Sequence, residues 1–363
     1  MTTIIRKAMS ATDQATQIRE GEELDVQAVD TYLKSQIPGL EGTPTITQFP
    51  GGASNLTYLV SYTGQDFVLR RPPFGKKAKS AHDMGREYRI LKQLGEGFPY
   101  CPKVYAHCTD ESVLGAEFYV MERIEGIILR AELPDDLGLD ETRTRELCKS
   151  FIDKFVDLHT LDYAACGLAD LGKPEGYVKR QIEGWIDRYQ KASTPDAPDW
   201  QTVMNWLREK MPADHSKPGL VHNDYRFDNV ILDPKNPMEI IGVLDWEMTT
   251  IGDPLMDLGN TLAYWIQADD PQAIQLMRRQ PSHAPGMLTR QEFADYYAEK
   301  AGIEIPNLDY YYTYGLFRLA GIMQQIYYRF YHGQTQDKRF GSFIHMNTLL
   351  EQTSLKVIGQ SAL

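Results

Sequence analysis

The dominant hydrophobic period of this chain changes near residue 125, and this change constrains the fold more than any other feature. Between residues 44 and 123, short apolar runs alternate with glycine-containing turns, a pattern typical of antiparallel strands. Within that region, residues 84–94 have the spacing of an amphipathic helix instead. From residue 126 onward, helical spacing dominates. The sequence therefore predicts an α+β fold with two lobes, a small antiparallel β lobe and a larger helical lobe.

The expected elements divide the 363 residues into three segments. Residues 1–22 are polar and aperiodic and are expected to form a flexible arm, residues 23–125 the N-terminal lobe, and residues 126–363 the C-terminal lobe. The first lobe should contain a helix at 24–37 and strands at 45–49, 56–62, 67–70, 103–108 and 117–123. The second should contain helices at 141–159, 174–191, 199–210, 254–267, 289–301, 308–332 and 340–357.

The charge of the chain argues against two broad classes of partner. It has 38 Lys and Arg against 50 Asp and Glu, a formal net charge of −12 at pH 7. Binding to nucleic acid or to an anionic membrane needs basic surface, so we expect neither partner. No apolar run is long enough for a membrane-spanning helix. The four cysteines lack C-x-x-C spacing, which favours reduced thiols and a cytoplasmic location, whereas the oligomeric state stays open.

The strongest chemical signal is the octapeptide from His222 to Asn229, which fits the pattern H-x-D-x-x-x-x-N. Two apolar runs follow it, at residues 230–232 and 240–244, and the prolines between them predict a turn. The two runs should form an antiparallel hairpin, in which the start of one strand lies beside the end of the other. Asn229 and Asp245 are then expected to lie together at its open end.

These side chains are of the kind that phosphoryl transfer from a nucleotide requires. A carboxylate must accept the proton of the attacking hydroxyl, and oxygen ligands must hold Mg²⁺ against the phosphates. We assign the first role to Asp224 and the second to Asn229 and Asp245. The alternative interpretation is that these residues only form turns and caps, the commonest use of Asp and Asn in loops.

A glycine-rich segment lies between two expected strands of the first lobe. In Gly51-Gly52-Ala53-Ser54-Asn55, the glycines would let the backbone approach phosphates, and Ser54 or the amides would donate to their oxygens. The alternative is an ordinary Gly-Gly hairpin turn. No G-x-x-x-x-G-K-[ST] sequence occurs in the chain, so a P-loop enzyme is not supported.

The next expected strand ends with a cation. Arg70 lies at the end of that strand, and Glu87 lies in the helix that follows. A strand cation that is held by a helix carboxylate would grip the phosphates of a nucleotide. The alternative is an ordinary surface ion pair, which would contribute little.

Together these residues resemble the aminoglycoside phosphotransferase family, the small-molecule branch of the protein-kinase-like fold. The resemblance is strongest to the branch that includes the kinase-like domain fused to some acyl-CoA dehydrogenases. The matching segments are residues 51–55, 68–73, 86–88, 119–122, 222–229, 244–247 and 252–258. The resemblance implies an ATP- and Mg²⁺-dependent enzyme in which Asp224 is the catalytic base, Asn229 and Asp245 bind magnesium, and residues 51–55 cover the phosphates.

The resemblance also assigns roles around the nucleotide. It implies that Glu87 orients the phosphate-gripping cation, and that the backbone around Glu122, Arg123 and Ile124 hydrogen-bonds the adenine. One position departs from the family pattern, because kinase-like enzymes usually have lysine where this chain has Arg70. Arginine keeps the positive charge but has a larger, planar head group, so the two residues do not hold phosphate in the same geometry.

The acceptor is less well defined. Residues 266–345 contain eight acids and eight bases, whereas a pocket for a polycationic aminoglycoside should concentrate carboxylates. Several arginines are candidates for meeting an anionic acceptor instead, or are solvated helix faces: Arg278, Arg279, Arg290, Arg318 and Arg329. Nine aromatic residues between positions 310 and 331 either line a pocket for an apolar group or pack the core.

Three hypotheses follow. The first is a phosphotransferase that acts on a hydroxyl of a small molecule, such as a hydroxylated acyl thioester or another anionic metabolite. The second is a kinase-like module that binds nucleotide or metabolite with little transfer, motivated by Arg70. The third is phosphorylation of an antibiotic. The sequence does not distinguish ATP from GTP.

Overall fold

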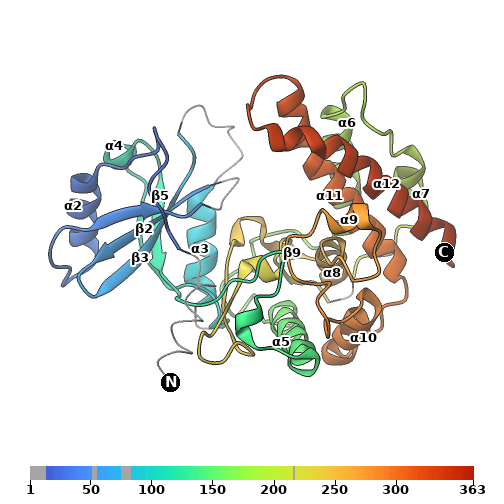
Figure 1. Ribbon diagram of the computed structural model, residues 1–363, viewed down its shortest axis with the longest axis horizontal. Helices are drawn as coiled ribbons and strands as arrows, with labels where there is room; N and C mark the ends of the chain where they lie inside the picture. Colours follow the sequence, from blue (N-terminus) through green and yellow to red (C-terminus); the bar gives the residue numbers. More distant parts are fainter. Residues whose placement is uncertain (1–13, 51–54, 75–82, 96, 216) are drawn as a thin grey trace. The chain divides into compact units, whose positions relative to one another are not determined.

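The computed structural model describes residues 14–50, 55–74, 83–95, 97–215 and 217–363 and is drawn in Figure 1. These residues form two compact units. Unit 1 contains the described residues up to Ile128, together with Ala164–Leu168 and Asn229–Glu247, and unit 2 contains the remainder. Unit 1 therefore combines the N-terminal strands with a segment from much later in the chain. The mixed α+β fold class that the sequence predicts is confirmed.

Unit 1 is built on a five-stranded antiparallel sheet with the strand order β1-β2-β3-β5-β4. The strands are β1 (Thr45–Gln48), β2 (Leu56–Tyr62), β3 (Gln65–Arg71), β4 (Val104–Cys108) and β5 (Phe118–Glu122). The helices are α2 (Val26–Gln36), α3 (Met84–Leu94) and α4 (Glu111–Leu114). All five predicted strands and the predicted inserted helix are present, whereas α4 was not expected.

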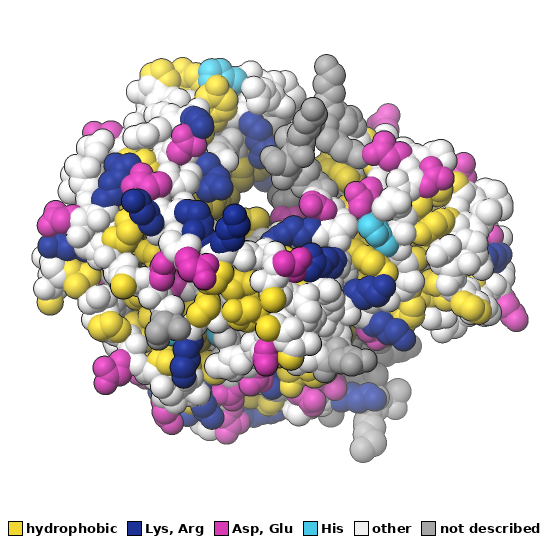
Figure 2. Space-filling model, turned by 180° about the vertical axis from the view of Figure 1, so that it is seen from behind, with side chains coloured by type: hydrophobic (Ala, Val, Ile, Leu, Met, Phe, Trp, Pro, Cys, Tyr) yellow, Lys and Arg dark blue, Asp and Glu magenta, His cyan; other side chains and the backbone are white. Residues whose placement is uncertain are grey.

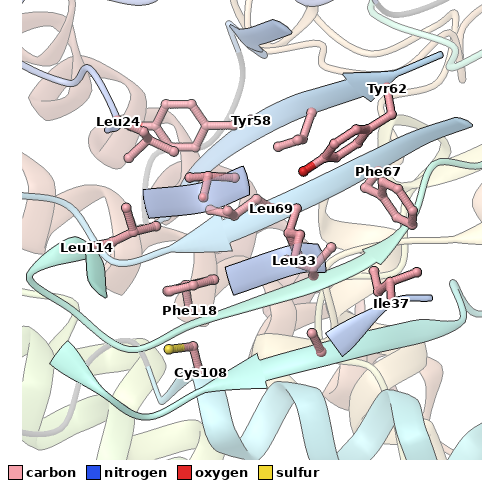
Figure 3. Packing of buried hydrophobic residues seen from close by; sticks show 14 of the residues in the cluster. Leu24, Leu33, Ile37, Tyr58, Tyr62, Phe67, Leu69, Cys108, Leu114 and Phe118 are labelled. Atoms are coloured by element: carbon pink, nitrogen blue, oxygen red, sulfur yellow. The ribbon is translucent and has the colours of Figure 1, made fainter. Parts of the chain in front are cut away.

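The two faces of the sheet carry different side chains. In β3, Phe67 and Leu69 belong to the buried cluster that α2 completes with residues such as Leu33. Figure 3 shows these side chains directed toward one another between the helix and the strands. Because side chains alternate along a strand, Arg70 lies on the opposite face, where α3 supplies Glu87 as its partner.

The predicted hairpin is confirmed. Strand β7 (Val230–Leu232) pairs antiparallel with β8 (Ile240–Val243), and Val230 lies opposite Val243. The amide of Leu244 donates to the carbonyl oxygen of Asn229 at 2.8 Å, which extends the pairing toward Asp245. The hairpin is attached to the rest of unit 1 by two hydrogen bonds between Ile127 and Leu232, of 2.9 and 2.8 Å.

Unit 2 is mainly helical. Its helices are α5 (Glu141–His159), α6 (Tyr177–Lys191), α7 (Gln201–Glu209), α8 (Pro254–Ala263), α9 (Gln272–Gln275), α10 (Arg290–Ala301), α11 (Leu308–Tyr331) and α12 (Phe343–Gln360). Strands β6 (Gly219–Val221) and β9 (Thr250–Gly252) pair antiparallel. The seven predicted helices are present. Helix α8 ends before the predicted residue 267, because the chain turns there to bury Trp265, whose Nε1 donates to the carbonyl of Leu288 at 2.7 Å.

Helix α11 is the centre of unit 2, with α6, α8 and α12 packed against it (Figure 1). Two glycines permit its close approach to α8, since a Cβ on Gly315 would lie 2.0 Å from the carbonyl oxygen of Gly259. The aromatic side chains of α11 include Tyr310, Tyr314 and Phe317, which are fully buried. These three rings therefore form core, one of the two uses that the sequence left open.

The surface agrees with the acidic composition. Acidic and basic side chains are both spread over the face in Figure 2. None of the helices in the described ranges is long and apolar enough to cross a bilayer.

The contact between α8 and α11 gives a test of the packing. We expect Gly315→Ala to lower the unfolding temperature, because the added methyl group meets backbone atoms, and overpacking of this kind costs about 1–3 kcal/mol. In the control Gly359→Ala, the new methyl group has nothing within 4 Å and improves helix propensity, so the temperature should be unchanged or slightly higher. Thermal unfolding followed by circular dichroism measures both. Equal changes of the unfolding temperature in the two variants would contradict this packing.

Candidate functional site

A buried arginine connects three segments of unit 1. Arg70 Nη1 donates to Glu87 Oε1 at 2.7 Å, and Arg70 Nη2 donates to Asp245 Oδ1 at 3.2 Å. The Arg70 side chain is 10% exposed and that of Glu87 is 1% exposed, whereas Asp245 keeps 34%. The predicted pair of strand cation and helix carboxylate is therefore present and is buried, which excludes the alternative of a surface ion pair.

A second carboxylate lies beside this pair. Glu247 Oε2 is 4.0 Å from Arg70 Nη2 and accepts a hydrogen bond from Asn55 Nδ2 at 2.8 Å. The carbonyl oxygen of Glu247 also accepts from Arg86 Nη1 at 3.2 Å. Asn55 is thereby tied to the segment that follows the hairpin. Gly51, Gly52 and Ser54, which the sequence placed over the phosphates, lie outside the described residues.

Burial and neighbouring charges have opposite effects on the pKa values of this cluster. Burial tends to lower the pKa of Arg70, but Glu87, Tyr119 and Asp245 outweigh it and raise that pKa well above its ordinary value. Burial raises the pKa of Glu87, and Arg70 opposes the rise. The 2.7 Å contact is that of a charged pair, so the guanidinium keeps its charge in a site with little solvent.

The open end of the hairpin has an unusual backbone. Asp245 has a φ of 69°, a left-handed conformation that is rare for residues other than glycine. Such a conformation persists where the surrounding structure holds it. The Asp245 carboxylate meets Arg70, and the backbone pairing places Asn229 next to Leu244. The two predicted metal ligands are thus neighbours at one end of the hairpin.

In unit 2, the loop that carries Asp224 is anchored by a buried carboxylate. Asp257, at the start of α8, accepts from the amides of His222 and Asn223 at 2.6 and 2.8 Å. Its Oδ2 is also 3.1 Å from His159 Nε2. Asp257 therefore braces the backbone of this loop, and both Asp257 and His159 are buried.

The Asp224 carboxylate is itself held by a neighbour. Arg226 Nη1 donates to Asp224 Oδ1 at 2.7 Å, and Arg226 Nε donates to Asp228 Oδ1 at the same distance. The guanidinium carbon lies 4.5 Å from the centre of the Tyr264 ring. The Asp224 side chain is 19% exposed. One arginine thus fixes the carboxylate and shares its charge between two acids.

The end of β5 carries the residues expected to meet adenine. Glu122 Oε2 accepts from the amide of Lys103 at 3.2 Å, which fixes that side chain beside β4. Arg123 forms an ion pair with Asp66. The side chains of Glu122 and Arg123 are therefore engaged within the sheet, and the role predicted for their backbone and for that of Ile124 remains a prediction.

Sequence reasoning did not single out Glu247 or Arg226. Glu247 lies two residues after Asp245, and Arg226 lies between Asp224 and Asp228. An arginine flanked on both sides by acids at a spacing of two is a signal for a shared ion pair in a tight loop. Glu247 carried no such signal, because its partner Asn55 is distant in the sequence.

Comparison with known proteins identifies what this chain resembles. Residues 45–293 match the phosphotransferase enzyme family. Rat acyl-CoA dehydrogenase family member 11 is 31% identical over 362 residues, which cover 96% of this chain and 45% of the rat protein. The chain therefore spans less than half the length of this relative.

Solved structures share the fold. A protein from Ralstonia eutropha, provisionally described as an aminoglycoside phosphotransferase, is 28% identical, has a TM-score of 0.79, and aligns over 94% of this chain and 100% of its own. Spectinomycin phosphotransferase, solved with ADP and spectinomycin, is 13% identical with a TM-score of 0.58, over 92% of this chain and 98% of its own. The second likeness establishes the fold alone.

The buried pair in unit 1 generates a stability prediction. We expect Glu87→Gln to cost about 3 kcal/mol or more, because it leaves the buried Arg70 without its main counter-charge. The matched control is Glu183→Gln, since Glu183 pairs with Arg208 at 2.6 Å but both side chains are more than 40% exposed. The control should cost less than about 1 kcal/mol. Urea unfolding compares the two variants, and similar losses would contradict a buried pair at Arg70.

Proposed function

This chain belongs to the phosphotransferase enzyme family, and from that premise we propose that it transfers the γ-phosphate of ATP to a hydroxyl of a small molecule, with Mg²⁺ as cofactor. The observation that carries the proposal is the buried Arg70, held by Glu87 and in contact with Asp245. A fixed cation next to a partly exposed carboxylate suits a site for a phosphate chain and its metal ion.

The donor set in unit 1 fits magnesium. Mg²⁺ prefers oxygen ligands and is usually held by one or two protein groups together with the phosphates of the substrate. Asn229 and Asp245 offer such oxygens at one end of the hairpin, and the described residues contain no cluster of three or more His, Cys, Asp or Glu that would form a complete protein cage. The bound ion would neutralise charge on the phosphates.

Asp224 is the proposed general base. The acceptor oxygen forms a bond to the γ-phosphorus while the bond from that phosphorus to the ADP oxygen breaks, and the acceptor proton passes to Asp224. Arg226 Nη1 donates to Oδ1 of Asp224 at 2.7 Å, which orients the carboxylate that would receive this proton. Asp257 fixes the backbone of the same loop, so the base is held in place before the substrate arrives.

The nucleotide contacts are proposed from the family pattern. Residues 51–55 would cover the phosphates, Arg70 would bind them, and the backbone of Glu122, Arg123 and Ile124 would bind adenine. ATP is the proposed donor, as the ADP bound in the structure of spectinomycin phosphotransferase suggests for that protein, and GTP is the alternative donor to be compared with it.

The proposed acceptor is a hydroxylated small molecule with an anionic or acyl thioester part. The support is the name of the rat relative, an acyl-CoA dehydrogenase family member, and the equal number of acids and bases in residues 266–345. A polycationic antibiotic fits this balance less well. Four free cysteines fit a reducing compartment, and we propose the cytoplasm.

A second candidate function is a binding module with little transfer. It is favoured by Arg70, whose two terminal nitrogens both meet carboxylates and whose planar head group differs from the usual lysine. Intact nucleotide binding without measurable turnover on any acceptor would support this candidate.

Asp224→Asn should lower kcat about a hundredfold or more, because an amide cannot accept the acceptor proton. Binding of MgATP should change little. Asp187→Asn is the control, since Asp187 is an exposed residue on α6 that pairs with Lys191. The measurement is ADP release in steady state with an acceptor found by screening. Undiminished turnover of Asp224→Asn would refute the assignment of the base.

MgATP should raise the unfolding temperature of the wild-type protein, since a ligand at ~100 times its dissociation constant adds ~2.7 kcal/mol. The shift should disappear in Asp245→Ala, which removes the proposed metal ligand. Asp233→Ala changes an acid at the opposite end of the same hairpin and should keep the shift. Thermal unfolding with MgATP, MgGTP and Mg²⁺ alone compares these proteins. A shift that survives in Asp245→Ala would contradict the metal assignment.

A further inference from the structure

Glu247 connects three segments of unit 1 that are far apart in the sequence. Its Oε2 accepts a hydrogen bond from Asn55 Nδ2 at 2.8 Å, although 192 residues separate the two. Its main-chain carbonyl oxygen accepts from Arg86 Nη1, on α3, at 3.2 Å. It also lies two residues after Asp245, the proposed metal ligand. One residue thus joins the start of β2, the helix that carries Glu87 and the end of the hairpin.

Asn55 is held from two sides. It precedes the first residue of β2 and is 2% exposed. Two residues further on, Thr57 lies opposite Arg70 in the pairing of β2 with β3, so the sheet fixes the main chain beside Asn55. Glu247 fixes the side chain. Because a buried carboxamide needs hydrogen-bond partners, this contact orients the residue that ends the glycine-rich segment.

The Glu247 carboxylate is partly compensated before any ligand binds. Its side chain is 23% exposed, and its Oε2, the oxygen that accepts from Asn55, lies 4.0 Å from Arg70 Nη2. The same nitrogen donates to Asp245 Oδ1 at 3.2 Å. The two acids therefore share one cation, and Oε2 of Glu247 is engaged within unit 1. This engagement favours a role in holding neighbouring residues in place.

The main chain between the two acids is anchored as well. Trp246 is 1% exposed, and its Nε1 donates to the carbonyl oxygen of Val243 in β8 at 2.8 Å. Its ring also packs edge-on against Phe98, with 5.7 Å between the ring centres. Asp245 and Glu247 are therefore carried by one fixed segment at the end of the hairpin, and a contact that holds Glu247 also holds the main chain of Asp245.

We propose that Glu247 is a positioning residue of the nucleotide site. Through Asn55 it fixes the end of the glycine-rich segment, and through its own main chain it fixes Asp245, so that the groups proposed for the phosphates and for Mg²⁺ are held in one arrangement. This inference rests on the proposed function. Glu247 acts through these neighbours and not by contact with the nucleotide. A preorganised site binds more tightly, because less ordering remains when the ligand arrives.

The test measures the dissociation constant of MgATP by isothermal titration calorimetry of the full chain, at a temperature where every variant is folded. Loss of stability alone does not change a constant that is measured on folded protein. The variants are Glu247→Ala, Asn55→Ala and the two combined. The matched control is Asp30→Ala, because Asp30 Oδ1 accepts from the Tyr62 hydroxyl at 2.9 Å at the opposite end of β2.

We expect Glu247→Ala to raise the dissociation constant about tenfold, since a hydrogen bond to a charged group is lost. Asn55→Ala should raise it at least as much, and the double variant no further, because both changes remove the same contact. Asp30→Ala should bind like the wild type. Glu247→Gln keeps an acceptor oxygen for Asn55 and should bind within about threefold of the wild type.

An exchange of the two groups keeps the proposal testable if Glu247→Ala does not fold. Asn55→Asp places two carboxylates against each other and should weaken the binding of MgATP. Adding Glu247→Gln should restore it, because the new amide then donates to the new carboxylate. Failure of the second change to restore the affinity would overturn the proposal.

Three further results would also overturn it. Unchanged affinity in Glu247→Ala would do so and leave the phosphotransferase proposal standing. An additive loss in the double variant, or a loss in Glu247→Ala without one in Asn55→Ala, would instead assign Glu247 a contact of its own with the metal ion or the phosphates. Absence of MgATP binding by the wild type is a different result, because it would reject the proposed function and this inference together.

Discussion

The ion pair between Arg70 and Glu87 is the interaction on which unit 1 depends most. It joins a strand to the helix inserted after it, at 2.7 Å and with the carboxylate 1% exposed. The same guanidinium reaches Asp245, so a segment from much later in the chain is tied to the sheet through one side chain. Removing a partner from such a pair leaves an uncompensated charge, which is why the pair constrains its surroundings. The cluster couples the stability of unit 1 to its proposed phosphate site.

In unit 2 the buried group that organises its surroundings is a carboxylate rather than a cation. There a buried carboxylate, Asp257, organises the loop by accepting two backbone amides, and Arg226 then holds Asp224. Arg70 is held by Glu87, and Asp224 is held by Arg226, and neither Glu87 nor Arg226 would take part in the chemistry. Preorganisation of this kind suits phosphoryl transfer, because the reaction depends on positioning and charge neutralisation more than on covalent help from the protein.

Arg318 stands apart from these satisfied pairs. Each buried charge in the two clusters has a counter-charge or backbone donors, whereas this guanidinium has an indole ring. Arg290, by contrast, is paired with Asp270 through both terminal nitrogens, and its side chain is 18% exposed. Gly315 and Gly321, on either side of Arg318, allow α8 and α6 to pack closely against α11, and this packing buries Arg318.

The sequence by itself determined the fold class, the strands and helices, and the hairpin that makes Asn229 and Asp245 neighbours, because hydrophobic period and turn residues act locally. It also indicated the pair of Arg70 and Glu87, since a strand and the next helix are close along the chain. Only the tertiary structure decided that this pair is buried, that the hairpin joins unit 1, and that Arg318 alone among five candidates is buried without a carboxylate. A charged side chain is buried or paired only when helices that are distant in the sequence pack against it. The local hydrophobic pattern does not specify which helices do so.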